Sequence, residues 1–140
     1  MDLTKLQGKN DFSETDFATL LFSNASKNGQ FVINLNSLEK RLYTYLDSMN
    51  QKTALPLTII EEEKRVDLSK SISFLATIGA ITCYSTVDES INCAIFIDEP
   101  QAEDIINSYS ITEKEKCIMI KEIADHIYPS KKSDTKNSQK

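Results

Sequence analysis

The sequence has few of the residues that mark specialised sites. Its 140 residues include no Trp, one His, and only three each of Gly, Pro and Cys. The three glycines are isolated, which excludes a glycine-rich loop that cradles phosphate. No apolar stretch approaches the roughly 20 residues of a membrane span. The first residues also lack the basic and then apolar layout of a secretion signal, so we expect a cytoplasmic protein.

The cysteines and the histidine do not form a metal-binding pattern. Cys83, Cys93 and Cys117 contain no CxxC pair and no dense disulfide spacing, so reduced thiols are expected. The neighbours of His126 on the same helix are Glu122 and Asp125, and a zinc site would need its other ligands from scattered positions. We predict no metal and no cofactor.

Catalytic patterns are also missing. There is no G-x-S-x-G turn to present a serine, and the acidic run 61–63 has no partner that would form an acid and base pair in one cleft. We therefore predict that the protein is not an enzyme and has no catalytic residues.

The composition is typical of one folded, acidic domain. Forty per cent of the residues are hydrophobic and 26% are charged, with a net charge of −5. The last segment, 130–140, has no apolar residue to bury. We expect an N-terminal arm over 1–12, a single domain over 13–129 and a disordered tail over 130–140.

Hydrophobic spacing predicts two helices in the first third of the chain. Ser13 with Asp16 is typical of a capping box, which opens a helix over about 14–27. Asn28 and Gly29 close it, and an extended piece over 31–33 follows. A second helix, with Asn34 or Asn36 as its cap, extends to about 50.

The middle of the chain is expected to be helical before its period changes. Pro56 suits the first turn of a short helix with the acids 61–63 on its solvated side. Asp67 or Ser69 opens another helix, which ends at Ile78 before Gly79. Two β-branched runs, 80–85 and 91–97, then flank the loop 86–90 and predict a hairpin.

Cys83 and Cys93 are symmetric about the centre of this loop, which predicts that they lie directly opposite one another. Two readings stay open: buried thiols that behave as small hydrophobic residues, or a redox switch.

Two helices are expected after the hairpin. The first begins at 98–100, and the second at a capping box of Thr112 and Glu115, with Ile111 as a hydrophobic staple. The second ends before Pro129. Their apolar residues either close the core or form a partner or dimer interface. These residues are Ile105, Ile106, Tyr109, Ile120 and Ile127.

The order helix, strand, helix, helix and glycine-led hairpin resembles a winged-helix domain over about 13–97. The stretch 74–81 looks like its third helix entering the wing. The resemblance implies a DNA reader or a protein-interaction module, such as the small acidic winged-helix subunits of coiled-coil ATPases. The expected fold class is α+β, mainly helical and winged-helix-like, with one C-terminal β-hairpin followed by two helices.

The charge distribution favours a protein partner over DNA. No Lys or Arg occurs from residue 71 to residue 113, so the expected wing is acidic and would repel phosphate. We predict an adaptor, accessory or inhibitor subunit that contacts a basic partner through the stretch 86–104, with a homodimer as a further option. The predicted contact residues are Asp88, Glu89, Asp98, Glu99, Glu103, Asp104 and Tyr109.

Two alternatives remain at this point. A transcriptional regulator would contact duplex DNA through Lys40, Arg41, Lys64, Arg65 and Lys70, although isolated basic pairs are usually solvated surface. The scarcity of Arg relative to Lys suggests an AT-rich bacterial or viral genome. An inhibitor from such a source that imitates nucleic acid would use the same acidic surface as the adaptor.

Overall fold

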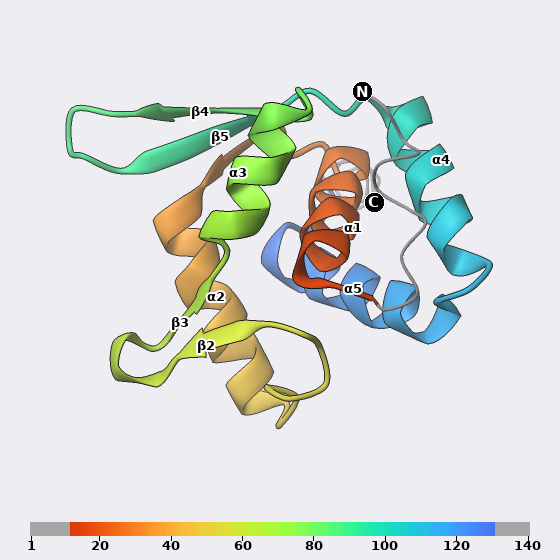
Figure 1. Cartoon of the computed structure of the whole chain (residues 1–140), viewed down its shortest axis with the longest axis horizontal. Coiled ribbons are helices and arrows are strands. Elements are labelled where there is room, and N and C mark those ends of the chain that lie inside the picture. The colour runs from red at the N-terminus through yellow and green to blue at the C-terminus, as the bar shows by residue number, and fades with distance from the viewer. Residues whose placement is uncertain (1–11, 131–140) are drawn as a thin grey trace, which may run out of the picture.

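A computed structural model describes residues 12–130. These residues form an α+β fold with five α-helices and two small antiparallel sheets (Figure 1). The expected arm over 1–12 and tail over 130–140 lie almost wholly outside the described residues. Within the described range, no helix is long and apolar enough to cross a membrane.

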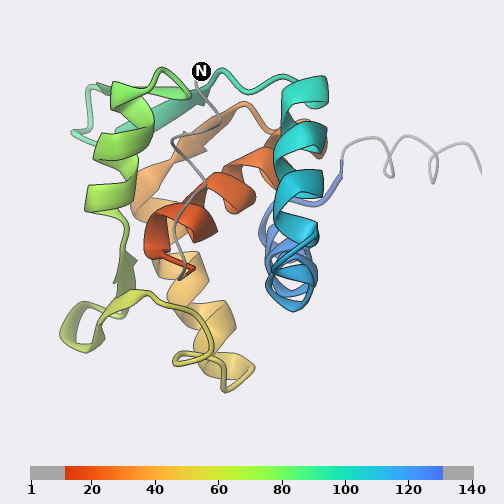
Figure 2. The same cartoon turned by 45° about the vertical axis from the view of Figure 1, so that its right-hand side comes forward.

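Helix α1 (Glu14–Lys27) is the centre of the fold, packed against α3, α4 and α5. Figure 2 shows it between α3 on one side and α4 on the other. The predicted capping box is present: Asp16 N donates to Ser13 Oγ, and Ser13 N donates to Asp16 Oδ2. Every residue from Asp16 to Ser26 is buried. The bounds 14–27 are therefore confirmed.

Strand β1 (Val32–Asn34) leads directly into α2 (Leu35–Ser48), which is capped by Asn34. Helix α3 (Ser69–Thr77) ends at Ile78, and Gly79 follows with φ 83°, a left-handed conformation in which a side chain would be strained. Strands β4 (Ile81–Ser85) and β5 (Ile91–Ile95) form the predicted hairpin. Helices α4 (Glu99–Ser110) and α5 (Lys114–Ile127) close the core.

The short helix predicted after Pro56 is wrong. The chain forms strand β2 (Thr58–Ile60), a 3-10 turn (Glu61–Glu63) and strand β3 (Arg65–Asp67), paired antiparallel. Lys64 closes the turn with φ 52°. Strand β3 packs on α2 and buries Val66 completely, and this contact between distant segments decides the structure. The three acids occupy the turn between the strands.

The capping box predicted at Thr112 and Glu115 is also wrong. The amides of Thr112 and Glu113 both donate to Tyr109 O, so the turn that leaves α4 continues through both residues. Helix α5 then begins at Lys114 without a side-chain cap. Ile111 is 84% exposed and makes no staple.

The hairpin is one part of a larger β-structure than expected. Strand β1 pairs with β5, which gives a three-stranded sheet of order β1-β5-β4, and β2–β3 is a second sheet. The single hairpin of the predicted fold class is corrected to these two sheets. Ile105, Ile120 and Ile127 are buried, so these residues of the two last helices close the core.

Candidate functional site: the projecting hairpin

The β4–β5 hairpin extends away from the helices, on the side of the molecule opposite α4 (Figure 1). In β4 only Ile81 is buried, and the other four residues are exposed. Val87 in the connecting loop is fully exposed. Strand β4 beyond Ile81 is therefore held mainly by pairing with β5, whereas β5 packs on the core through Cys93 and Ile95.

The three-stranded sheet has one buried face and one exposed face. Ile33, Ile81, Cys93 and Ile95 lie on the buried face, against the core. Side chains alternate along a strand, so their neighbours point to the opposite face. We call this the outer sheet face, and it consists of Val32, Thr82, Tyr84, Ala94 and Phe96, together with Asn34 and Asn92, which lie in register with Tyr84.

The outer sheet face is uncharged, and its large exposed side chains are apolar or aromatic. Val32 is 48% exposed, Tyr84 is 44% exposed and Phe96 is 61% exposed. Val32 and Thr82 flank Ala94 in register, so the residues form one continuous surface across the strands. Strands β1, β4 and β5 contain no charged residue. Isolated exposed apolar residues are ordinary, but a contiguous group of this kind is typical of an interaction surface.

The acids at the end of the hairpin have different roles. Asp88 shapes the loop, because Thr86 Oγ1 donates to its carboxylate and Ser90 N donates to Oδ1 at 3.2 Å. These hydrogen bonds, that of Thr86 first, lower the pKa of Asp88. Glu89 is exposed and has φ 66°. The hairpin therefore ends in two negative charges.

The remaining predicted acids lie elsewhere. Asp98 caps α4 by accepting from Gln101 N at 2.8 Å, and Glu103 pairs with Lys27 at 3.3 Å. Glu99 and Asp104 are exposed on the same helix. Figure 1 shows α4 and the hairpin end at opposite sides of the molecule, so the stretch 86–104 does not form the single contact surface that was predicted.

Tyr109 is a core residue, contrary to the prediction. It is 6% exposed, and its hydroxyl donates to Asp16 Oδ1 in α1. Burial first, and then this hydrogen bond, raise the pKa of Tyr109. Asp16 is 93 residues away in the sequence. A phenol that is buried and paired with a carboxylate offers little surface to another protein.

Two of the predicted DNA-contact residues, Arg65 and Arg41, are engaged within the protein. Arg65 is surrounded by carboxylates: Glu63, Glu39 at 3.2 Å and Asp67 at 3.9 Å. The buried Glu39 also accepts from Leu68 N at 2.9 Å, which ties β3 and the start of α3 to α2. Lys64 and Lys70 are exposed. Sequence reasoning missed the contact with Glu39, which lies 26 residues before Arg65 in the chain.

Arg41 is occupied by the end of α5. Its Nη2 donates to Ile127 O at 2.9 Å, and its guanidinium lies 5.6 Å from the centre of the Tyr128 ring. The last carbonyl groups of a helix have no partner within the helix, so Arg41 supplies one for α5. Sequence spacing along α2 gave no signal for this contact.

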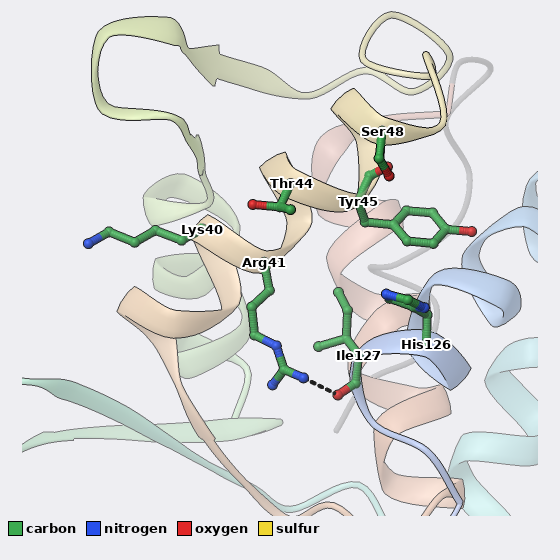
Figure 3. Close-up of a pocket in the computed structure, with 7 residues that line it drawn as sticks. All are labelled: Lys40, Arg41, Thr44, Tyr45, Ser48, His126 and Ile127. Atoms are coloured by element: carbon green, nitrogen blue, oxygen red, sulfur yellow. Dashed lines mark hydrogen bonds between the residues drawn. The ribbon is translucent and has the colours of Figure 1, made fainter.

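A pocket of about 270 Å³ lies beside this contact, between α2 and α5 (Figure 3). Figure 3 shows the Tyr45 ring above His126, and their ring centres are 4.9 Å apart. The Lys40 side chain points away from these rings in the same view. The lining consists of Lys40, Arg41, Thr44, Tyr45, Ser48, His126 and Ile127.

No group of three or more His, Cys, Asp or Glu residues within 12–130 could hold a metal ion. The candidate site is the outer sheet face together with Asp88 and Glu89 in the loop of the hairpin. Comparisons with protein families, with curated proteins and with solved structures find no match for this chain.

Proposed function

We propose that the protein is a non-enzymatic protein-binding module, an adaptor, accessory or inhibitor subunit that uses the projecting hairpin. The outer sheet face is the observation that carries this proposal. Tyr84 and Phe96 are the residue types that contribute most binding energy in interfaces, because they bury a large rigid surface at a low cost in entropy. The buried core of the body does not include Tyr84 or Phe96, so both side chains are available to bind a partner.

The chemistry of the hairpin specifies the partner. It is a protein with an apolar surface bordered by basic side chains. The apolar part covers the outer sheet face, and the basic part lies beside Asp88 and Glu89. Charge complementarity of this kind raises the association rate and sets the orientation. Because no Lys or Arg occurs from 71 to 113, no cation within the hairpin weakens the attraction between its acids and a basic partner.

The winged-helix resemblance is part of the same proposal. It is supported by the order α1, β1, α2, α3, β4 and β5. The β2–β3 sheet is an addition to that order. In this interpretation the hairpin is the wing. Its apolar face and its two acids favour a protein over a phosphate backbone, which carries negative charge.

The test is a pair of matched surface variants of the full chain. Tyr84→Ser with Phe96→Ser removes the apolar groups of the outer sheet face. Ile111→Ser with Ile118→Ser removes two exposed apolar groups elsewhere, at 84% and 51% exposure. After crosslinking in the native cell, the partner is identified, purified and titrated with each variant by calorimetry.

We expect the hairpin variant to lose about 30-fold or more in affinity, since two interface aromatic residues contribute about 1–2 kcal/mol each. The matched variant keeps its affinity. Glu89→Gln should slow association and weaken its salt dependence. Equal binding by both double variants would exclude the outer sheet face.

Two further results would overturn the proposal. The first is a molar mass in solution twice that of one chain, which only the hairpin variant reduces. The outer sheet face would then bind a second copy of the chain. The second is salt-sensitive binding to a mixed-sequence duplex that Lys40→Glu with Lys70→Glu abolishes. That result would assign the regulator function instead.

A further inference from the structure

The hairpin brings two thiols together. Cys83 in β4 and Cys93 in β5 are direct partners in the strand register, as the sequence predicts, and their Sγ atoms lie 3.7 Å apart. Both cysteines are free. Two sulfur atoms at this distance are already in contact, and only a small movement separates them from a covalent bond.

The backbone geometry also suits a bond between them. Thr86 N donates to Ser90 O, and Phe96 N donates to Ala80 O. Hydrogen-bonded and non-hydrogen-bonded pairs alternate along an antiparallel ladder, so Cys83 and Cys93 form a non-hydrogen-bonded pair. Cα atoms in such pairs are about 4.5 Å apart, within the range of about 4.4–6.8 Å found in disulfides. The strands can therefore keep their register when the thiols are joined.

The two thiols differ in their access to solvent. Cys83 is exposed, whereas Cys93 is completely buried. Burial, followed by the charge and hydrogen bond of Cys83, raises the pKa of Cys93 to about 12. Cys93 is thus a protonated thiol at neutral pH, and Cys83 is the sulfur that a dissolved reagent meets first.

We propose that Cys83 and Cys93 are a reversible oxidation site, which forms an intramolecular disulfide by exchange with a low-molecular-weight disulfide. In the first step the Cys83 thiolate attacks one sulfur of the reagent, whose disulfide breaks and releases one thiol. In the second step the Cys93 sulfur attacks Cys83 Sγ, and its proton passes to the second departing thiolate. Two protein thiols are oxidised, and one small disulfide is reduced to two thiols.

The exposure of Cys83 makes this bond accessible to small thiols, and disulfides of this class are labile. Reduced thiol in excess therefore restores the two cysteines. The bond would connect the exposed part of β4, at Cys83, to the buried Cys93 of β5.

Glutathione is the probe for the experiment, with the full chain carrying Cys117→Ser so that only the pair remains. The protein is equilibrated with mixtures of oxidised and reduced glutathione, quenched with acid and weighed intact by mass spectrometry. We expect loss of two hydrogens, no accumulated glutathionyl adduct, and recovery of the reduced mass in excess reduced glutathione.

Single-cysteine variants are the controls. Cys93→Ser and Cys93→Ala should both accumulate the adduct on Cys83, with a lifetime more than about tenfold longer than in the chain with both cysteines, because the second step is intramolecular there. Cys83→Ser should leave Cys93 unreacted. The proposal is overturned by an equal adduct lifetime in both chains, by a disulfide between two chains, by absence of reaction, or by a bond that reduced glutathione does not reverse.

Discussion

Helix α1 and the β4–β5 hairpin are both apolar, yet their environments are opposite. In α1 eleven consecutive residues are buried, among them Thr19, Asn24 and Ser26, whose polar side chains donate to backbone carbonyl groups. In β4 four of five residues are exposed, and the β-structure places two aromatic rings in solvent. The comparison separates apolar surface that folding requires from apolar surface that is left for a partner.

The largest loss of stability is expected from a substitution in α1. Leu20→Ala deletes a fully buried side chain in the central helix and should cost about 2–5 kcal/mol of the free energy of unfolding. Val87→Ala at the end of the hairpin is the matched truncation and should cost less than about 0.5 kcal/mol. Urea unfolding measures both. Similar losses at the two sites would show that the hairpin is part of the cooperative core.

A smaller loss of stability is expected at Glu39, which connects the β2–β3 sheet to α2. Glu39→Gln removes the charge that faces Arg65 and weakens the acceptor of Leu68 N, so the free energy of unfolding should fall by about 1–3 kcal/mol. Glu62→Gln on the exposed turn is the control and should change it little. If the two variants unfold at the same urea concentration, the Glu39 network does not stabilise the fold.

Alkaline pH should destabilise the protein through a phenol in the body, that of Tyr128. Burial raises the pKa of Tyr128 to about 12 in the folded protein, against about 10 when unfolded. Its contribution is complete below pH 10 and is lost as the pH rises from 10 towards 12, at up to about 1.4 kcal/mol per pH unit. Tyr128→Phe should flatten this decline in urea unfolding between pH 9 and 11. An equally steep decline in the variant would show that Tyr128 does not cause the loss of stability.

Local signals in the sequence predict the elements that local interactions determine. The capping box of Ser13 and Asp16, the apolar spacing that follows and the terminal Gly29 all agree for α1, and both of its bounds are correct. The hairpin and the opposition of Cys83 to Cys93 follow in the same way from alternation around a short loop.

Contacts between distant segments explain the errors. Val66 is buried against α2, which makes a strand of a segment whose own pattern favours a helix. Tyr109 is assigned to the surface by its amphipathic character, but its hydroxyl is satisfied by Asp16, a residue whose local role as a cap gave no sign of a second partner. The acids of the hairpin and of α4 are close in the sequence but separated in space.

The outward edge of β4 also affects how the protein behaves in concentrated solution. The backbone N–H and C=O groups of Cys83 and Ser85 point away from β5, and β4 contains no charge, proline or bulge that would hinder another strand from pairing there. Repulsion between negatively charged chains is then the main protection, and it disappears near the isoelectric point of about 4.9. We expect solubility to be lowest at that pH, and the precipitate to show the 4.7–4.8 Å spacing of stacked strands.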